Sequence, residues 1–481
     1  GISSFQARFR FSYYRAIKSH MNYQEAIAYI QSFPDMERAT YGARGPTMGL
    51  PSMRSLLERM GNPQLGRKTV HIAGSKGKGS TATMITRILD ETGLRTALYT
   101  SPHLHDYCER IAFGSTPISK EAFARGVAEI KPFVEAEKAD GNTSISTYGI
   151  LTALFFHLVS KADPAVDIQI VEVGLGGRYD VTNVFTAKEV AVITPISLEH
   201  VEILGSSPTE IAANKAGIIT PRCTAVLAPQ KDKGATTAVG RRCREVHADF
   251  VDVGRSYKIR VINQDASGQT FAIESEQGRF EFEIPMVGVH QVSNAATAIA
   301  AVRALKEHGI DPTEDQIRAA LKKTTVPGRM QVLSGMKAGQ KSGGPIIVID
   351  AAHNHESANA LATTIKETFG ADSCIFVLGL NKDKNISAVW KELLGLCRIC
   401  IATRSRNPRS ADPRDIAEVV STFGSSDDSV VLTDCVADGI DRAIDIARDG
   451  EIICVTGSMY VVGEAREHVL EDRAWDLIAT R

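Results

Sequence analysis

The segment Val70-His71-Ile72-Ala73-Gly74-Ser75-Lys76-Gly77-Lys78-Gly79-Ser80-Thr81 decides the fold of this chain. Residues 69–73 are mostly apolar or β-branched and predict a buried strand, whereas residues 81–92 carry apolar side chains at helical spacing up to Gly93. Glycines between the two elements allow backbone N–H groups to approach a phosphate closely, and a helix N-terminus adds partial positive charge. The segment therefore predicts a phosphate-binding loop between a strand and a helix.

Two polar side chains of this loop have expected partners in a complex of a nucleotide with Mg²⁺. Lys78 is expected to contact the terminal phosphates, and the hydroxyl of Ser80 at the start of the helix is expected to hold Mg²⁺. The predicted ATP-binding residues of the loop are Gly74, Ser75, Lys76, Gly77, Lys78, Gly79, Ser80 and Thr81. The Walker spacing G-x-x-x-x-G-K-[ST] is not met, because position 72 is Ile and Gly79 separates Lys78 from Ser80. This departure weakens a kinase or GTPase interpretation, and an ordinary glycine-rich turn is the alternative.

The spacing from Gly74 to Ser80 resembles the ATP loop of the Mur-ligase superfamily, and the inserted Gly79 resembles its folylpolyglutamate synthase branch. The resemblance extends over about residues 22 to 470 and includes several further motifs in the same order. It implies an α/β protein with an N-terminal P-loop ATPase domain, a small antiparallel β subdomain and a C-terminal Rossmann-like domain that ligates glutamate. The segment 324–330 gives the predicted boundary, with domains at 1–326 and 327–481.

The patterning after residue 246 agrees with this organisation. Three short segments between residues 257 and 284 alternate apolar and polar side chains around two turns, which predicts an antiparallel meander. Beyond residue 344 the patterns of strands and helices alternate, which predicts a second α/β unit. This unit lacks a G-x-G-x-x-G loop, so we do not expect it to bind a dinucleotide.

The composition excludes several classes of protein. The chain has 481 residues and a net charge of −1, which gives no reason to expect binding to nucleic acid. No run of about 18 apolar residues predicts a membrane span. Residues 1–20 are basic but lack the apolar core of a secretory signal. They faintly resemble a transit peptide, and a helical extension is the interpretation we favour.

The cysteines indicate a reducing compartment. Eight cysteines in a chain of this length are typical of reduced thiols, so we expect a cytoplasmic protein. Cys397 and Cys400 form a C-x-x-C in an apolar run with no second pair nearby. This pattern favours core thiols over a zinc or redox site.

Two side chains at predicted strand ends are candidates for binding Mg²⁺. Glu172 is the one acid in the apolar segment 168–173, and a buried carboxylate requires a cation. His200 follows the apolar segment 190–196, so it lies on the same rim if the sheet is parallel. A water-facing edge position for Glu172 and a structural role for His200 are the alternatives. The string from 172 to 183 matches the family motif E-V-G-L-G-G-R-x-D-x-T-N, and the resemblance implies that Glu172 and His200 bind Mg²⁺, although Glu199 stands where the family usually has Asp.

Lys215 is a third candidate for binding the metal. Ser207-Pro208-Thr209-Glu210 predicts the start of a helix, and Lys215 follows among small apolar residues. A lysine in a helix is ordinarily exposed to solvent, which is the alternative here. The string I-A-x-x-K-A-G-I resembles the family, and the resemblance implies that Lys215 is carbamylated and serves as a catalytic residue and metal ligand.

A further string resembles the pterin-binding loop of the family. Residues 99–104, Tyr-Thr-Ser-Pro-His-Leu, match it without a gap and are followed by Glu-Arg-Ile at 109–111. The alternative is a simple turn, because proline fixes φ and removes a donor. The resemblance implies that the folate contacts are Thr100, Ser101, Pro102 and His103.

Amide side chains in the segment 288–296 suit recognition of adenine and ribose. Gln291 and Asn294 are the predicted ATP contacts in this segment. The alternative is that Ser293 or Asn294 caps the helix that follows.

The C-terminal domain resembles the family at two further places. The resemblance implies ATP contacts by Arg329 and Asp350, and glutamate contacts by His353 and Ser458, with His353 also a catalytic residue. In the string from Asp350 the family has proline at the position of His355. Asp350 and His353 could instead cap the following helix.

The function implied by the resemblance is ATP-dependent ligation. ATP and Mg²⁺ phosphorylate a carboxylate of a folate or dihydropteroate, and the amine of L-glutamate attacks the acyl phosphate. We expect these small-molecule partners, no nucleic acid or membrane partner, and a monomer. Two alternatives remain, namely a Mur-type ligase acting on a cell-wall precursor and a non-catalytic ATP-binding homologue. The T-S-P-H-L and G-K-G-S strings argue against the first, and the intact candidate residues Lys78, Glu172, His200 and Lys215 argue against the second.

Overall fold

The computed structural model describes residues 21–35, 49–142, 144–334, 344–423 and 429–471. The chain divides into two compact units, the first made of residues 1–101, 108–252 and 300–312 and the second of residues 102–107, 253–299 and 313–481. Each unit combines helices with a mainly parallel sheet, so the predicted α/β class is confirmed. The interpretation of residues 1–20 lies outside the described residues.

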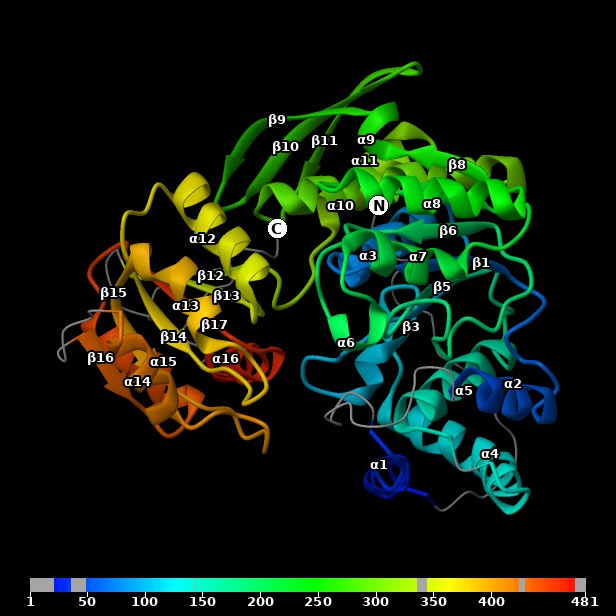
Figure 1. The fold of residues 1–481 in the computed structure, drawn as a ribbon, viewed down its shortest axis with the longest axis horizontal. Coiled ribbons are helices and arrows are strands. Elements are labelled where there is room, and N and C mark those ends of the chain that lie inside the picture. Colours follow the sequence, from blue (N-terminus) through cyan, green and yellow to red (C-terminus); the bar gives the residue numbers. More distant parts are fainter. Residues whose placement is uncertain (1–20, 36–48, 143, 335–343, 424–428, 472–481) are drawn as a thin grey trace, which may run out of the picture. The chain divides into compact units, whose positions relative to one another are not determined.

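The first unit is built on an eight-stranded sheet of order β4-β3-β2-β5-β1-β6-β7-β8 (Figure 1). β1 lies inside the sheet and pairs in parallel with β5 and β6, and the antiparallel pairings are those of β3 with β2 and β4. The strands are β1 (Lys68–Ala73), β2 (Thr96–Tyr99), β3 (Ile111–Phe113), β4 (Thr116–Pro117), β5 (Ile168–Glu172), β6 (Val190–Ile193), β7 (Thr224–Leu227) and β8 (Asp249–Asp252).

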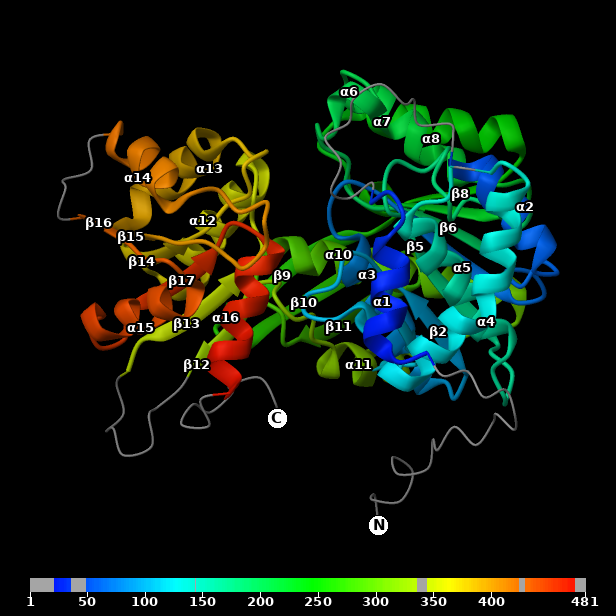
Figure 2. The same ribbon diagram turned by 90° about the horizontal axis from the view of Figure 1, so that it is seen from below.

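Helices pack on this sheet. α3 contacts β2 and β5, α7 and α8 bury apolar side chains against β6 and β7, and α2, α4 and α5 contact one another (Figure 2). The helices are α1 (Tyr23–Gln31), α2 (Gly49–Arg59), α3 (Lys78–Glu91), α4 (Lys120–Ala139), α5 (Thr147–Ser160), α6 (Val201–Leu204), α7 (Pro208–Lys215) and α8 (Lys233–Val246), with 3₁₀ turns at Tyr107–Arg110 and Ala216–Ile218.

The second unit contains two sheets. Its antiparallel meander, of order β11-β10-β9, confirms the prediction for residues 257–284. Its six-stranded sheet, of order β12-β13-β17-β14-β15-β16, is parallel except for β12. The strands are β9 (Lys258–Asp265), β10 (Gly268–Ser275), β11 (Gly278–Ile284), β12 (Gln331–Ser334), β13 (Ile346–Asp350), β14 (Cys374–Leu378), β15 (Cys397–Ala402), β16 (Val430–Leu432) and β17 (Ile452–Thr456).

The six-stranded sheet is buried on both faces, as its nearly continuous apolar strands predict. Alternate residues of β13, β14 and β17 pack with α12, α13 and α14 on one face and with α15 and α16 on the other. The helices are α9 (Val253–Ser256), α10 (Val289–Ala304, which runs on into the first unit), α11 (Glu314–Lys323), α12 (His355–Phe369), α13 (Ile386–Leu393), α14 (Pro413–Ser421), α15 (Val436–Ile446) and α16 (Met459–Glu471), with 3₁₀ turns at Leu305–His308 and Leu394–Leu396.

Two predicted helix starts were wrong. α3 begins at Lys78 rather than Thr81, because Gly77 adopts the left-handed conformation (φ 81°) and caps the helix earlier. Residues 40–51 are rich in glycine and proline, which favours a loop before a helix that begins at Met53. α2 instead begins at Gly49, because Pro51 is tolerated in a first helical turn. Both errors shortened helices whose first turns contain glycine or proline.

The cysteines and the helix lengths can be read directly from the structure. All eight cysteines are free thiols, Cys400 is buried and Cys397 partly buried, and burial raises the pKa of the Cys397 thiol to about 12. In the part of the chain that the structure describes, no helix is long and apolar enough to cross a membrane.

Candidate active site

The predicted phosphate loop joins β1 to α3 at the carboxyl edge of the eight-stranded sheet. Gly74 has φ 154°, and a Cβ there would lie 1.8 Å from Thr194 Oγ1, so this position requires glycine. The N–H groups of Ser75 and Lys76 donate to the Pro195 carbonyl at 3.0 and 3.3 Å. These two hydrogen bonds hold the loop against the segment that follows β6. The other N–H groups of the loop lie at the start of α3.

The first turn of α3 supplies the groups that a phosphate would need. Thr81 N–H donates to the Gly77 carbonyl, which leaves the N–H groups from Gly77 to Ser80 outside the helical pattern. Lys78 Nζ donates to the Gly74 carbonyl at 3.1 Å, so its charge lies over the loop. Thr81 is fully buried, and Ser80 is 5% exposed. These features fit a nucleotide phosphate bound at a helix N-terminus.

Glu172 ends β5 beside this turn. Because β5 lies between β1 and β2, the edge-strand alternative is wrong, and the side chain is only 3% exposed. Its Oε2 accepts a hydrogen bond from Ser101 N–H at 3.0 Å. A Cβ on Gly79 would lie 3.4 Å from the same oxygen, so the inserted glycine brings the loop against the carboxylate.

Lys215, the last residue of α7, is buried at the same loop. Its Nζ donates to the Gly74 carbonyl at 2.9 Å and to Glu199 Oε1 at 2.8 Å, and the residue is 1% exposed. The solvent-exposed alternative is therefore wrong. The pKa of Lys215 is lowered to about 8, chiefly by burial and also by the charge of Lys78, whereas Glu199 opposes the shift. Burial by itself would raise the pKa of Glu199, but Lys215 and Lys78 lower it.

The structure brings together only some of the predicted metal ligands. Ser80 and Glu172 belong to this site and offer oxygen donors, which Mg²⁺ prefers. His200 is an exposed residue with φ 44° that precedes α6. The described ranges contain no group of three or more His, Cys, Asp or Glu side chains that could hold a metal ion. Besides Ser80 and Lys215, the predicted metal ligands include only two side chains of these types, Glu172 and His200. Metal binding by these four residues therefore stays a prediction.

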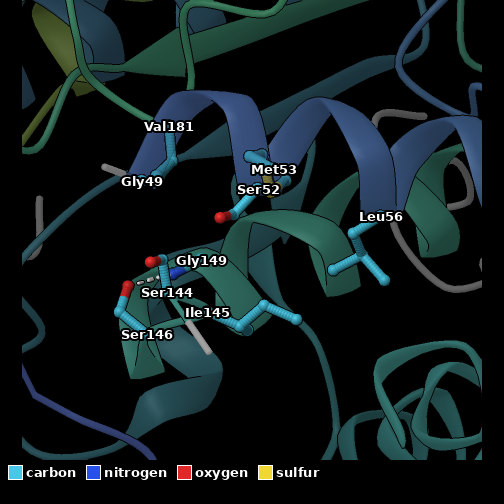
Figure 3. A pocket seen from close by; sticks show the side chains of 9 residues that line it. All are labelled: Gly49, Ser52, Met53, Leu56, Ser144, Ile145, Ser146, Gly149 and Val181. Carbon is cyan, nitrogen blue, oxygen red and sulfur yellow. Dashed lines mark hydrogen bonds between the residues drawn. The ribbon is translucent and has the colours of Figure 1, made fainter. Parts of the chain in front are cut away.

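A small pocket lies between α2 and the start of α5 (Figure 3). Its empty volume is about 200 Å³, including space open to solvent. Figure 3 shows Val181 facing Gly49, where a Cβ would lie 3.1 Å from the valine, and Ser146 capping α5 through Gly149 N–H at 3.1 Å. The lining residues are Gly49, Ser52, Met53, Leu56, Ser144, Ile145, Ser146, Gly149 and Val181.

The segment interpreted as a pterin-binding loop follows β2. Thr100 N–H donates to the Arg110 carbonyl at 3.0 Å, and Ser101 contacts Glu172. Pro102 begins the part of this segment that belongs to the second unit, where the His103 ring lies 4.4 Å from that of Tyr107. Thr100 and Ser101 therefore adjoin the phosphate loop, and the folate contacts stay a prediction.

The predicted adenine and ribose contacts lie in the second unit. Gln291 and Asn294 are inside α10, buried, and Asn294 Nδ2 donates to Gln291 Oε1 at 3.0 Å. Since α10 begins at Val289, neither Ser293 nor Asn294 caps it, and the capping alternative is wrong. Their contact with ATP stays a prediction.

The predicted residues near the end of β13 and the start of α16 form hydrogen bonds with backbone groups of nearby residues. Asp350 Oδ2 accepts from Met330 N–H at 2.8 Å, next to Arg329, and His353 Nδ1 lies 2.8 Å from the Ala351 carbonyl. Asn354 caps α12, so that role does not belong to Asp350 or His353. Ser458 is 3% exposed, and its Oγ accepts from Val461 N–H in the first turn of α16.

Glu199 is the site residue that sequence reasoning missed. We treated it as a departure from the family pattern beside His200, yet it forms the ion pair with Lys215. A carboxylate in the loop that follows β6, the strand next to β1, was the available signal. Its partner, 16 positions along the chain, could not be inferred from spacing.

Comparison with known proteins identifies two family models. The Mur ligase middle domain matches residues 72–302, and the glutamate ligase domain of the Mur ligases matches residues 328–459. The dihydrofolate synthase/folylpolyglutamate synthase of Mycobacterium tuberculosis is 32% identical over 87% of this chain and 89% of that protein. The folylpolyglutamate synthase of Lacticaseibacillus casei is 30% identical over 94% of this chain and 99% of that protein.

Solved structures agree in fold over nearly the whole chain. The folylpolyglutamate synthase of M. tuberculosis complexed with ADP has a TM-score of 0.81 at 29% identity, covering 93% of this chain and 98% of that one. E. coli FolC in complex with DHPP and ADP has a TM-score of 0.79 at 25% identity, covering 95% of this chain and 100% of that one. The chain therefore belongs to the folylpolyglutamate synthase and dihydrofolate synthase family of Mur-type ligases.

Proposed function

We propose that this chain is an ATP-dependent ligase that joins L-glutamate to a folate, and that dihydropteroate is a second acceptor. The observation that carries the proposal is the Gly74 carbonyl, which accepts hydrogen bonds from both Lys78 and Lys215. Two lysine amines and the Glu172 carboxylate therefore surround one loop. The names of the relatives support the choice of acceptor, and none of the relatives named above is a ligase for a cell-wall precursor.

The charges of the site suit phosphorylation of a carboxylate. An anionic acceptor must approach an anionic γ-phosphate, so cations must screen both groups. Lys78 and the N–H groups of the first turn of α3 hold the phosphates, and the acceptor oxygen attacks phosphorus while ADP leaves. The glutamate amine then attacks the acyl carbon, and phosphate leaves with the acceptor oxygen. Mg²⁺ held by Ser80 and Glu172 would neutralise the charge that develops on the phosphates.

We propose that the pocket between α2 and α5 receives the flat ring of the acceptor. Met53, Leu56 and Val181 give it apolar walls, and Ser52 and Ser144 bring hydroxyls to its lining. Apolar walls suit the faces of a flat ring, and the two hydroxyls suit the polar groups at its edge.

The test of the proposed function is an omission assay. ADP formation is measured with ATP, Mg²⁺, L-glutamate and either tetrahydrofolate or dihydropteroate, and each component is left out in turn. We expect ADP only when acceptor and glutamate are both present. ADP that forms equally well without an acceptor, or only with a cell-wall precursor, would reject the proposal.

Glu172→Gln is expected to slow turnover by about a hundredfold and to raise the Mg²⁺ concentration needed for half-maximal rate, because it removes the buried carboxylate charge while keeping the side-chain shape. The rate is measured across a Mg²⁺ titration, and His200→Ala is expected to act in the same direction. Glu189→Gln is the control, because Glu189 also accepts a backbone N–H beside β1, at Thr69. Near-normal rates at saturating Mg²⁺ in both site variants would make these residues structural.

His353→Ala is expected to raise the KM for glutamate by about tenfold while the KM for ATP stays nearly unchanged, since it removes one polar contact to the amino acid. Steady-state kinetics with each substrate varied separately measures both constants. The matched control is His355→Ala, an exposed histidine two positions away that pairs with Glu392. An unchanged glutamate constant would move the amino-acid site elsewhere.

A further inference from the structure

A chain of buried polar side chains crosses the interior of the first unit beside β1. Lys188 Nζ lies 2.8 Å from His71 Nδ1, and His71 Nε2 lies 2.9 Å from Thr182 Oγ1. Thr182 Oγ1 donates to Asp180 Oδ1 at 2.5 Å. The exposed fractions are 5% for Lys188, 0% for His71 and Thr182, and 8% for Asp180. Four polar side chains are thus linked in one line within an apolar core.

The hydrogen bonds of this chain run in one direction. A carboxylate only accepts, so the Thr182 hydroxyl donates to Asp180 and must itself accept from His71 Nε2–H. His71 is then neutral, with Nδ1 as the acceptor for Lys188. Burial lowers the pKa of His71 well below its usual value, and Lys188 lowers it further, which agrees with this tautomer. Phe185 packs edge-on against the His71 ring at 5.6 Å and excludes water from it.

Asp180, the last side chain in this series of hydrogen bonds, holds a turn that contains Val181. Asp180 Oδ1 accepts from Thr182 N–H at 2.9 Å, and Asp180 Oδ2 accepts from Leu175 N–H at 3.0 Å. Asp180 therefore ties Thr182 to the loop that leaves Glu172 at the end of β5. Val181, between Asp180 and Thr182, forms a wall of the pocket between α2 and α5.

We propose that Lys188, His71 and Thr182 are positioning residues for the acceptor, because they hold Asp180 and thereby fix the wall of the pocket at Val181. The inference rests on the proposed function of that pocket. None of the three residues lines the pocket, so their effect on the acceptor is transmitted through the Asp180 clamp. The N–H groups of Ser75 and Lys76 hold the phosphate loop at the Pro195 carbonyl, a contact that none of these four side chains makes. We therefore expect the KM for ATP to change less than the KM for the acceptor.

A network with only a structural role predicts a different kinetic result. A structural network would contribute to folding stability and affect both substrates alike once the protein is folded. A positioning network changes the KM of the acceptor and leaves the KM of ATP unchanged. Because the hydroxyl of Thr182 is the central link, replacing only that group separates the two cases.

The test compares Thr182→Val with Thr182→Ser in the full-length protein. Valine keeps the shape but removes the hydroxyl, whereas serine keeps the hydroxyl. We expect Thr182→Val to raise the KM for tetrahydrofolate by about tenfold with less than about a twofold change for ATP, and Thr182→Ser to stay close to wild type. Lys188→Met, at the other end of the chain, is expected to raise the same constant. Thr86→Val is the control, since Thr86 is equally buried and bonds only the Ala82 carbonyl in α3.

The spectroscopic arm observes His71 directly. In ¹⁵N-detected imidazole spectra, with the resonance assigned by its loss in His71→Gln, wild type should show a neutral ring protonated at Nε2 between about pH 6 and pH 8. Thr182→Val should shift this resonance. A His71 that titrates in this range, or that carries its proton on Nδ1, would overturn the proposed chain.

The outcomes separate the two proposals. An active wild type whose Thr182→Val variant has unchanged acceptor kinetics overturns the positioning role but leaves the ligase function standing. Equal rises in the KM values for the acceptor and ATP also overturn it. A wild type without acceptor-dependent turnover rejects the ligase function, and in that case the acceptor KM has no meaning and the positioning role falls with it.

Discussion

Lys78→Ala is expected to reduce glutamate-dependent ADP formation by at least about a hundredfold while the protein stays folded. The side chain is the one at the start of α3 that reaches back over the loop, where it bonds the Gly74 carbonyl. Without its charge, the γ-phosphate and the acceptor carboxylate would meet with less screening in a partly buried site. Rates are measured at saturating ATP, so that a binding defect alone does not explain the loss.

Lys231→Ala is the matched control, because it removes an exposed lysine of the same unit. Thermal unfolding of both variants checks that the fold is kept. A folded Lys78→Ala protein that forms product at a normal rate would show that the loop does not bind the reacting phosphate.

Lys215→Ala is expected to be nearly inactive and to regain part of its activity with a short-chain carboxylate such as acetate. Lys78 and Lys215 both donate to Gly74, so an ammonium at position 215 places cation next to cation. We propose that CO₂ adds to the neutral amine with loss of a proton, which gives a carbamate anion able to ligate Mg²⁺. The pKa of Lys215, lowered to about 8 by burial, makes the neutral amine accessible.

The ion pair with Glu199 offers a different explanation of the role of Lys215. If the lysine acts as an ammonium bound to Glu199, then Lys215→Arg should keep activity, because arginine preserves the charge and the pair. The carbamate account predicts that Lys215→Arg is inactive, because a guanidinium does not add CO₂ in this way. Chloride at equal ionic strength controls for salt. Full activity of Lys215→Ala without an additive would refute the carbamate.

Much of the fold could be predicted because periodicity reports burial on each element. The alternating segments of the meander and the apolar strands of the C-terminal sheet lie where the sequence indicated them. The starts of α2 and α3 could not be predicted, since a left-handed Gly77 and an early Pro51 decide them locally. Helix ends depend on such single residues more than on the pattern.

Site residues could be predicted only where the sequence around them also determines the strand or helix that carries them. Lys78, Glu172 and Lys215 stand in strings that also fix their strand or helix, and the structure brings them to one loop. His71 and Lys188 lie 117 positions apart and meet only because β6 pairs with β1. Neither shows a local sign of this contact, since a histidine in a strand and a lysine before one are both ordinary.

The transfer of oxygen from acceptor to phosphate tests the central claim most directly. Tetrahydrofolate carrying ¹⁸O in its terminal carboxylate is incubated with ATP, Mg²⁺, L-glutamate and the protein, and the released phosphate is analysed by mass. If the carboxylate attacks the γ-phosphate and glutamate then displaces phosphate, each phosphate carries one ¹⁸O from the folate. Phosphate without the label, released at the rate of product formation, would contradict a ligase that acts through an acyl phosphate.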